Sequence, residues 1–438
     1  MTEGHLTRFS TILATALMFA VCRTGKLDGQ RPVTRTGPLS VTGQTAPDLA
    51  PFDRLLTSFV REHAIPGAAL AVVRDGHLML ARGYGWADLQ AGTPVQPRSL
   101  FRIASLSKPI TAVAILQLVD RGKLTLASRP FQLLPPVSEP AGGRFVDARL
   151  ARITILQLLQ HTGGFDRDRS FDPMFRSVRI ARAVGVRPPA GPDAIIRYMR
   201  EQPLDFDPGT HYAYSNFGYC VLGRVIEQVA KCPYEKYVQD NVLRPLGIHD
   251  MQIGHTLRSG RADREVTYYT PDTDKRPSVV GAIGKPVEPP YGAWYLEAMD
   301  AHGGWLASVV DMARFACAWG RAPGARVLSD HAVETMFARP TGPAGFESNG
   351  KPKAVYYGCG WLVRPTADGR ANQWHTGALP GTATLMVRRH DGLCWIVLFN
   401  TRHDPSGGSL TAKIDPLLHR AADAVKRWPK HDLFQEYK

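Results

Sequence analysis

The 438-residue chain has no hydrophobic run of the roughly 20 residues that a helix needs to cross a bilayer, so no stable membrane span is expected. Its six cysteines show no Cys-x-x-Cys spacing and no close cluster, which indicates neither a zinc site nor a disulfide scaffold. The net charge is +14, yet the basic residues are scattered and no nucleic-acid-binding signature is present. We therefore expect a globular protein that binds no nucleic acid.

The N-terminal residues have features of an export signal. Arg8 is followed by an apolar run from Phe9 to Cys22, as in the hydrophobic region of a secretory signal peptide. The charge before this run is weak, because Glu3 nearly cancels Arg8, and no clear cleavage site follows. We expect residues 1–46 to be a signal peptide or N-terminal anchor followed by a linker; the alternative is an ordinary N-terminus. The first interpretation predicts a periplasmic or secreted protein.

An apolar helix is predicted directly after the segment SLSK at 105–108. The serine and lysine of this segment, Ser105 and Lys108, are three residues apart, so one helical turn brings the hydroxyl and the amine to the same face. Such a pair is a nucleophile beside its activating group, at a helix N-terminus whose dipole favours negative charge. A second Ser-x-x-Lys, from Ser348 to Lys351, lies in a Gly/Pro-rich stretch and is interpreted as a loop.

Strands are predicted near both ends of the chain and helices between them. Asp75-Gly76 between two apolar runs is a hairpin signal, and His390-Asp391-Gly392 is another. Helices are predicted over residues 51–64, 153–160, 194–201, 216–230, 234–243, 311–319, 329–337 and 410–428, and further strands over 360–364, 382–387 and 394–400. This order indicates an α+β fold, with an antiparallel sheet made from both chain ends, flanking N- and C-terminal helices and an inserted, mainly helical lobe.

We expect one catalytic domain over residues 47–430. The domain divides into two lobes. The α/β lobe comprises approximately residues 47–125 and 300–430, and the helical lobe comprises approximately residues 126–299. Residues 166–192, rich in Arg, Pro and Gly, and residues 255–295, which lack clear periodicity, are expected to be loops that wall a cleft.

Two further motifs carry groups suited to catalysis. Tyr214-Ser215-Asn216 precedes a predicted helix, where the tyrosine could shuttle a proton and the asparagine could donate an amide hydrogen bond; its other interpretation is a core tyrosine followed by a helix cap. His-Thr-Gly occurs at His161, after a helix, and again at His375, where it opens a strand. An edge strand with free N–H groups beside a nucleophile is what an oxyanion hole needs, and the other interpretation is a turn before a hairpin.

The chain resembles the serine β-lactamase and penicillin-binding-protein superfamily. The resemblance rests on three motifs in the same order: Ser-x-x-Lys, Tyr-x-Asn and Lys/His-Thr-Gly. Within this superfamily, the chain is most similar to class C β-lactamases and family VIII carboxylesterases. The phrases LLQHTGG at 158–164, PGT at 208–210 and GGWLAS at 303–308 add to the likeness, which covers residues 50–425.

The resemblance implies that Ser105 is the acylated nucleophile and that Lys108 and Tyr214 take and return its proton. Free lysine has a pKa of about 10.4 and free tyrosine of about 10, so either must fall by roughly 3 to act as a base at pH 7. Burial would make Lys108 a neutral amine, or a charged Lys108 would hold Tyr214 as a phenolate; the sequence leaves both open. No metal and no organic cofactor is implied.

The resemblance also implies substrate-binding residues. Asn216 would contact the amide of a substrate's acyl side chain, and the backbone N–H groups of the serine and of Ala378 would form the oxyanion hole. His375, followed by Thr376 and Gly377, stands where many relatives have lysine. Lysine offers a permanent charge to a substrate carboxylate, whereas histidine is mostly neutral at pH 7.

That departure favours the hydrolysis of carboxylic esters. The alternatives within the family are a D-amino-acid peptidase or amidase and a β-lactamase. An alternative of another class is a non-catalytic, penicillin-binding-like sensor of the cell wall, although such a module would usually lack a catalytic residue that this chain retains. The expected partner is a small ester, amide or D-peptide, and the sequence leaves the oligomeric state open.

Overall fold

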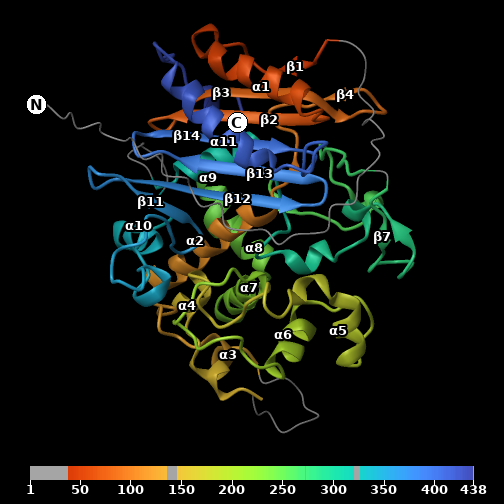
Figure 1. The fold of residues 1–438 in the computed structure, drawn as a ribbon, viewed down its shortest axis with the longest axis vertical. Helices are drawn as coiled ribbons and strands as arrows, with labels where there is room; N and C mark the ends of the chain where they lie inside the picture. Colours follow the sequence, from red (N-terminus) through yellow and green to blue (C-terminus); the bar gives the residue numbers. More distant parts are fainter. Residues whose placement is uncertain (1–37, 136–145, 272, 320–325, 438) are drawn as a thin grey trace, which may run out of the picture. The chain divides into compact units, whose positions relative to one another are not determined.

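The computed structural model describes residues 38–135, 146–271, 273–319 and 326–437. The predicted signal segment from Phe9 to Cys22 lies outside these residues. Among them, an antiparallel sheet of nine strands has the order β1-β3-β2-β14-β13-β12-β11-β10, with β4 beside β3 (Figure 1). These strands are β1 (Val41–Thr42), β2 (Gly67–Arg74), β3 (His77–Asp88), β4 (Thr93–Pro94), β10 (Tyr356–Tyr357), β11 (Leu362–Pro365), β12 (Ala371–Leu379), β13 (Thr382–Arg388) and β14 (Leu393–Phe399).

The sheet joins both ends of the chain, as predicted. β2 pairs with β14, so that Ala71 lies opposite Ile396 in the middle of the sheet. Both predicted hairpins form, since Arg74 pairs with His77 across the Asp75-Gly76 turn and β13 pairs with β14. Nearly every residue of β2 and all of β14 are buried, because both faces of the sheet are covered.

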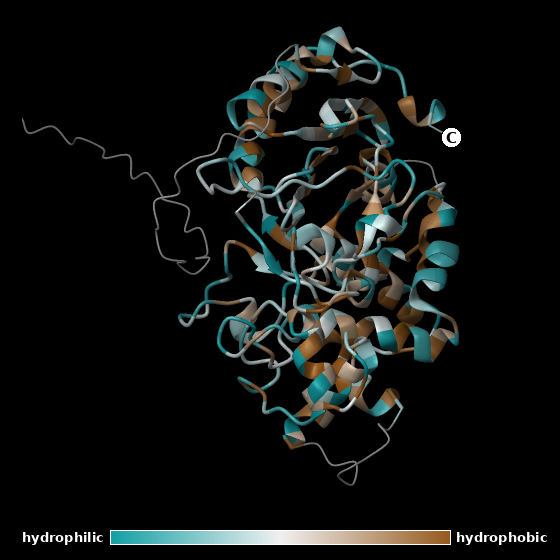
Figure 2. Cartoon of the chain, turned by 90° about the vertical axis from the view of Figure 1, so that its right-hand side faces the viewer, coloured by the Kyte–Doolittle hydropathy of each residue, from teal (hydrophilic) through white to brown (hydrophobic). Residues whose placement is uncertain are grey.

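Two helices from opposite ends of the chain cover one face of this sheet (Figure 1). They are α1 (Ala50–Glu62) and α11 (Leu410–Asp423), which pack on each other and on the sheet around Trp395, Leu70 and Leu385. α11 ends at Asp423 rather than at 428, since the chain turns away after Ala424. In Figure 2 the helices carry alternating hydrophilic and hydrophobic bands, as expected of helices with one face against a core.

The opposite face of the sheet packs against α9 (Val309–Cys317), and the central helix α2 (Ser107–Asp120) lies between this region and the helical lobe. The lobe contains α3 (Pro130–Leu133), α4 (Ile155–Leu159), α5 (Ser177–Ala183), α6 (Pro192–Arg200), α7 (Asn216–Ala230) and α8 (Tyr234–Val238), while α10 (Asp330–Phe337) packs on α2. All residues of α2 from Ser107 to Leu118 are buried. Neighbours therefore surround this part of the helix, and it reaches the surface at its end, where Asp120 is exposed.

Segments that the sequence presented as loops are partly ordered into short elements. Residues 166–192 contain α5 and a 3₁₀ turn at Pro173–Phe175. Residues 255–295 contain the two-residue strands β7 (Arg276–Pro277) and β8 (Pro286–Val287). A small sheet of β5 (Phe101–Arg102), β9 (Trp305–Ala307) and β6 (Gln252–Ile253) joins the segment before α2 to the two lobes. Within the described ranges, no helix has the length and apolarity to cross a membrane.

Candidate active site

Ser105 lies in a 3₁₀ turn, Ala104–Leu106, that leads into α2. The turn is held by a hydrogen bond of 2.7 Å from the Ser107 hydroxyl to the Ala104 carbonyl. Ala104 has a φ of +47°, a left-handed conformation that costs energy for a residue with a Cβ atom. The strained residue directly before Ser105 turns the serine out of the helix, so that Ser105 is partly exposed while its neighbours are buried.

Lys108 is fully buried and its Nζ atom has three polar neighbours. It lies 3.0 Å from Ser105 Oγ, 2.8 Å from Asn216 Oδ1 and 2.9 Å from the carbonyl oxygen of His302. Burial lowers the pKa of Lys108 well below its usual range; the charge of Arg167 lowers it further, and the charge of Asp172 opposes the shift. These directions favour the neutral amine beside the serine.

Tyr214 lies near the same serine, close enough for the Ser105 side chain to act on the pKa of its phenol. Two basic groups lie over the tyrosine ring: the Lys108 amine and the Arg167 guanidinium are each 4.7 Å from the ring centroid, and the guanidinium is the permanent cation of the two. Burial nevertheless raises the pKa of Tyr214, against the opposing effects of the Ser105 side chain and of Arg167. The phenol is therefore the favoured form. The structure brings Ser105, Lys108 and Tyr214 together, and their catalytic roles stay a prediction.

Asn216 is the first residue of α7, and both the oxygen and the nitrogen of its side-chain amide form hydrogen bonds. Its oxygen accepts a hydrogen bond from Lys108, and its nitrogen donates one of 2.6 Å to Asp172 Oδ2. One amide hydrogen thus goes to a carboxylate, although the sequence predicted a donor to the substrate. The helix cap is the neighbouring Ser215, whose hydroxyl accepts from the backbone N–H of Gly218.

His375 lies in the middle of β12 and points inward. The strand begins at Ala371, so the prediction that this triplet opens a strand is wrong by four residues. Nδ1 of His375 is 2.7 Å from the Thr376 carbonyl and Nε2 is 2.9 Å from the Tyr357 hydroxyl, so both ring nitrogens have protein partners. Burial lowers the pKa of His375 to about 3, and the charge of Lys108 acts in the same direction. The histidine is neutral.

The C-terminal half of β12 is a free sheet edge beside Ser105. β11 pairs with β12 only as far as Trp374, so among the described residues the strand has no strand partner on that side from His375 to Leu379. In the two-residue hairpin, Leu379 opposes Thr382, and the backbone N–H of Ala378 consequently points to the open side. A Cβ atom on Gly377 would lie 3.0 Å from the Ser105 nitrogen, which shows how closely the two backbones approach.

The family assignment follows from a comparison with known proteins. The chain matches the family model described as beta-lactamase over residues 52–418. It belongs to the beta-lactamase family. The match covers both lobes and every residue of the arrangement described above.

Individual relatives of this beta-lactamase-family chain carry names from several activities. It is 33% identical to esterase EstB of Burkholderia gladioli over 46% of the chain and 50% of the esterase. It is 32% identical to penicillin-binding protein 4 of Amycolatopsis lactamdurans over 75% of the chain and 78% of that protein. The chain thus spans half the length of the first relative. These names indicate a serine hydrolase.

Solved structures show the same fold. The D-amino acid amidase of Ochrobactrum anthropi SV3, complexed with L-phenylalanine amide, has a TM-score of 0.62 at 20% identity. The alignment covers 86% of this chain and 99% of that one. Sequence comparison and fold therefore agree on the family.

An aromatic wall behind Tyr214 was not predicted from the sequence. The His161 ring lies 4.4 Å from that of Tyr214 and 4.5 Å from that of Tyr357, between centroids. His161 follows α4 with a φ of +57°, consistent with the predicted helix C-terminus, and its Nδ1 accepts from the Ser215 N–H over 3.2 Å. The repeated His-Thr-Gly was the signal that could have marked this histidine.

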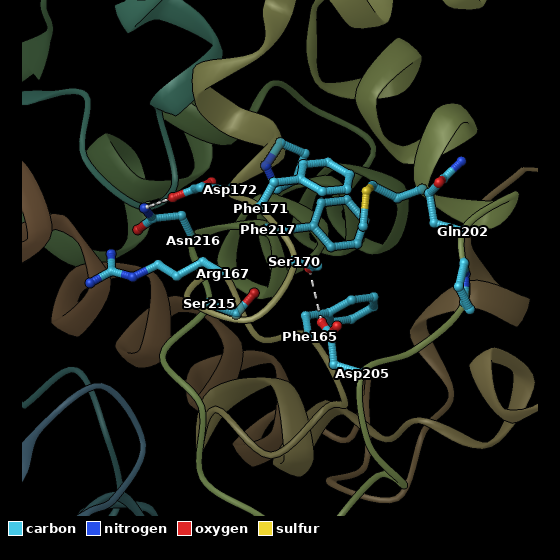
Figure 3. A pocket seen from close by; sticks show the side chains of 13 residues that line it. Phe165, Arg167, Ser170, Phe171, Asp172, Gln202, Asp205, Ser215, Asn216 and Phe217 are labelled. Carbon is cyan, nitrogen blue, oxygen red and sulfur yellow. Dashed lines mark hydrogen bonds between the residues drawn. The ribbon is translucent and has the colours of Figure 1, made fainter. Parts of the chain in front are cut away.

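Arg167 and Asp172 are the other groups that the sequence did not reveal. Both come from the segment interpreted as a variable loop, and both lie beside a cavity of about 150 Å³ in the helical lobe (Figure 3). Phe165, Phe171 and Phe217 form much of its apolar wall. Ser105 is outside the lining, so the cavity lies behind the catalytic groups instead of forming their cleft.

Proposed function

We propose that the protein is a serine hydrolase that forms an acyl-enzyme on Ser105 and hydrolyses carboxylic esters. The observation that carries the proposal is the position of Ser105 Oγ, 3.0 Å from the buried Lys108 amine, which itself lies over the Tyr214 ring. A neutral amine at this distance can accept the serine proton while the serine oxygen attacks a carbonyl carbon.

Lys108 and Tyr214 together carry the serine proton to the leaving group. As the Oγ–carbon bond forms, the serine proton passes to Lys108, and the oxyanion lies between the N–H groups of Ser105 and Ala378. The carbon–oxygen bond to the leaving alkoxide then breaks. The alkoxide takes the Tyr214 proton, which the Lys108 ammonium replaces. Water repeats the sequence on the acyl-enzyme and releases the acid.

The preference for esters rests on His375. A buried, neutral imidazole with both nitrogens engaged offers no permanent charge to a substrate carboxylate, which β-lactams and peptide C-termini carry. The relative named esterase EstB supports the same choice. A neutral ester needs only the nucleophile, the proton relay and the oxyanion site.

A second candidate is a D-amino-acid peptidase or amidase, or a β-lactamase. The guanidinium of Arg167 over the Tyr214 ring favours it, because this cation could pair with a substrate carboxylate in place of the missing lysine. The relative named penicillin-binding protein 4 supports this alternative.

The test compares p-nitrophenyl acetate and butyrate with nitrocefin. Ester turnover that disappears in Ser105→Ala, with little reaction of nitrocefin, is the expected result. Ser348→Ala, in the exposed loop of the second Ser-x-x-Lys, is the matched control and should retain full activity. Faster turnover of nitrocefin than of the esters would favour the second candidate. Ester hydrolysis that persists in Ser105→Ala would contradict both.

A further inference from the structure

A hydrogen-bonded chain runs from a carboxylate in the helical lobe to the nucleophile. Asp172 accepts from the Asn216 nitrogen over 2.6 Å, and the Asn216 oxygen faces the Lys108 amine at 2.8 Å. The amine in turn lies 3.0 Å from Ser105 Oγ. Figure 3 shows the Asp172 and Asn216 side chains directed toward one another.

The direction of these hydrogen bonds determines whether the lone pair of the Lys108 amine is available to Ser105. A neutral amine has two N–H groups and one lone pair. Two of its neighbours, the Asn216 oxygen and the His302 carbonyl, can only accept, so they use both N–H groups. The lone pair is then left for the third neighbour, Ser105. With the Asn216 amide reversed, its NH₂ group would face the amine and compete for this lone pair.

We propose that Asp172 is a positioning residue that fixes the Asn216 amide with its oxygen toward Lys108, and thereby turns the amine lone pair to Ser105. This inference rests on the proposed function of Ser105. Burial raises the pKa of Asp172, whereas the bonds from Asn216 and Met174 and the charge of Arg167 favour its carboxylate form. The carboxylate is a pure acceptor and can receive only the NH₂ end of the asparagine. The neutral Lys108 amine can either donate to the Asn216 oxygen or accept from its nitrogen, so of these two neighbours of the amide it is Asp172 that accepts only.

Asp172 itself is oriented by the turn in which it lies. Its Oδ1 atom accepts from the backbone N–H of Met174 over 3.1 Å, as the cap of the short 3₁₀ helix. Both carboxylate oxygens are therefore occupied by donors. An asparagine at 172 has one oxygen for these two donors, and keeping the cap would direct its NH₂ group at Asn216. The substitution Asp172→Asn is thus expected to reverse the Asn216 amide.

This expectation separates positioning from a purely structural role. Asp172→Ala removes the acceptor without adding a donor and leaves both orientations of Asn216 accessible. Positioning predicts that reactivity decreases from wild type to Asp172→Ala and further to Asp172→Asn. If Asp172 only filled space and capped the turn, the isosteric asparagine would be the milder change.

The experiment measures the rate at which a fluorophosphonate probe labels Ser105 in the full chain, from pH 5 to pH 10, with the labelled residue identified by mass spectrometry. We expect labelling to slow by about 10²-fold in Asp172→Asn, the scale of a displaced catalytic group, and the high-pH plateau to fall. Asp205→Asn is the matched control, since Asp205 lines the same cavity and accepts from Ser170 and the Asp166 N–H.

A double-mutant comparison tests whether the effect passes through the amide. In an Asn216→Ala background, Asp172→Asn should change the labelling rate by less than about threefold. An additive loss would overturn the proposal, as would wild-type labelling in Asp172→Asn or a larger loss in Asp172→Ala. Wild-type protein that is not labelled at Ser105 would instead refute the proposed function. Circular dichroism and thermal unfolding establish that each variant is folded.

Discussion

The Tyr357 hydroxyl lies 2.9 Å from Nε2 of His375 and so occupies that ring nitrogen. The other ring nitrogen is bound to the Thr376 carbonyl, so Nδ1 carries the proton and Nε2 accepts from the tyrosine. His375 is therefore part of the wall of the site. Its contribution to specificity is the absence of a charge at a position where a lysine would supply one.

Buried neutral histidines make the stability of the fold depend on pH. Burial lowers the pKa values of His161, His302 and His375, so between the usual value of about 6.5 and the lowered one the unfolded chain binds protons that the folded chain does not. Unfolding free energy consequently falls as the pH drops below about 6.5. With its pKa lowered to about 3, His375 should cost about 2 kcal/mol at pH 5 relative to pH 7.5.

Urea unfolding of wild type and His375→Gln at these two pH values measures the contribution of one ring. The change in unfolding free energy between pH 7.5 and pH 5 should be smaller in the variant by about 2 kcal/mol. His77→Gln, exposed at the start of β3, is the control and should match wild type. An unchanged pH difference in His375→Gln would mean that this histidine is protonated in the folded protein.

Lys108→Met should lower the acylation rate by about 10²- to 10⁴-fold, the usual effect of losing a general base, with little change in KM. In wild type, the rate should rise with pH as the amine loses its proton. Because burial lowers the pKa of Lys108, the midpoint should lie well below 10. Stopped-flow measurement of the p-nitrophenol burst provides the profile. A midpoint near the value of free lysine would favour the phenolate of Tyr214 as the base, and Lys351→Met should have no effect.

The fold could be predicted where local signals and tertiary structure agree. The Asp75-Gly76 turn, the helix from Asn216 to Ala230 and the pairing of the two chain ends all follow from turn chemistry and periodicity. The start of β12 was missed because residues 371–374, Ala-Asn-Gln-Trp, lack a clear alternation. α2 was expected to be an apolar helix; that it is buried on all sides from Ser107 to Leu118 is determined by its neighbours.

The site could be predicted in its residues but not in all of their directions. Motif spacing predicts Ser105, Lys108 and Tyr214 as site residues, yet nothing local indicates that Asp172 meets Asn216 from 44 positions away. The inward direction of His375 could have been predicted, because it alternates with the exposed Thr376 along the strand. Contacts between polar residues that are far apart in the sequence can be predicted only once the fold is known.

Arg167→Gln should distinguish substrates with and without a carboxylate. Removing the cation over Tyr214 should raise KM for nitrocefin by about tenfold, the effect of about 1.4 kcal/mol, and leave KM for p-nitrophenyl butyrate unchanged. Since the Arg167 charge lowers the pKa of Lys108, the midpoint of the pH–rate profile should also move to higher pH. Arg169→Gln is the matched control, because this neighbour binds the Asp205 carbonyl. Equal effects on both substrates would exclude a role in recognising carboxylates.

Gly377→Ala should damage catalysis more than stability. A Cβ atom at this position would lie 2.3 Å from both the Ile103 carbonyl and the Thr384 hydroxyl, so β12 would have to move away from the turn that holds Ser105. The two N–H groups proposed as the oxyanion hole would then separate, and loss of one such donor costs about 10²- to 10³-fold in kcat. Gly191→Ala, at a glycine with open space around its Cβ position, should keep wild-type turnover. Steady-state kinetics with p-nitrophenyl butyrate, alongside thermal unfolding, separates the two effects: a folded Gly377→Ala protein with undiminished kcat would show that the edge of β12 takes no part in stabilising the oxyanion.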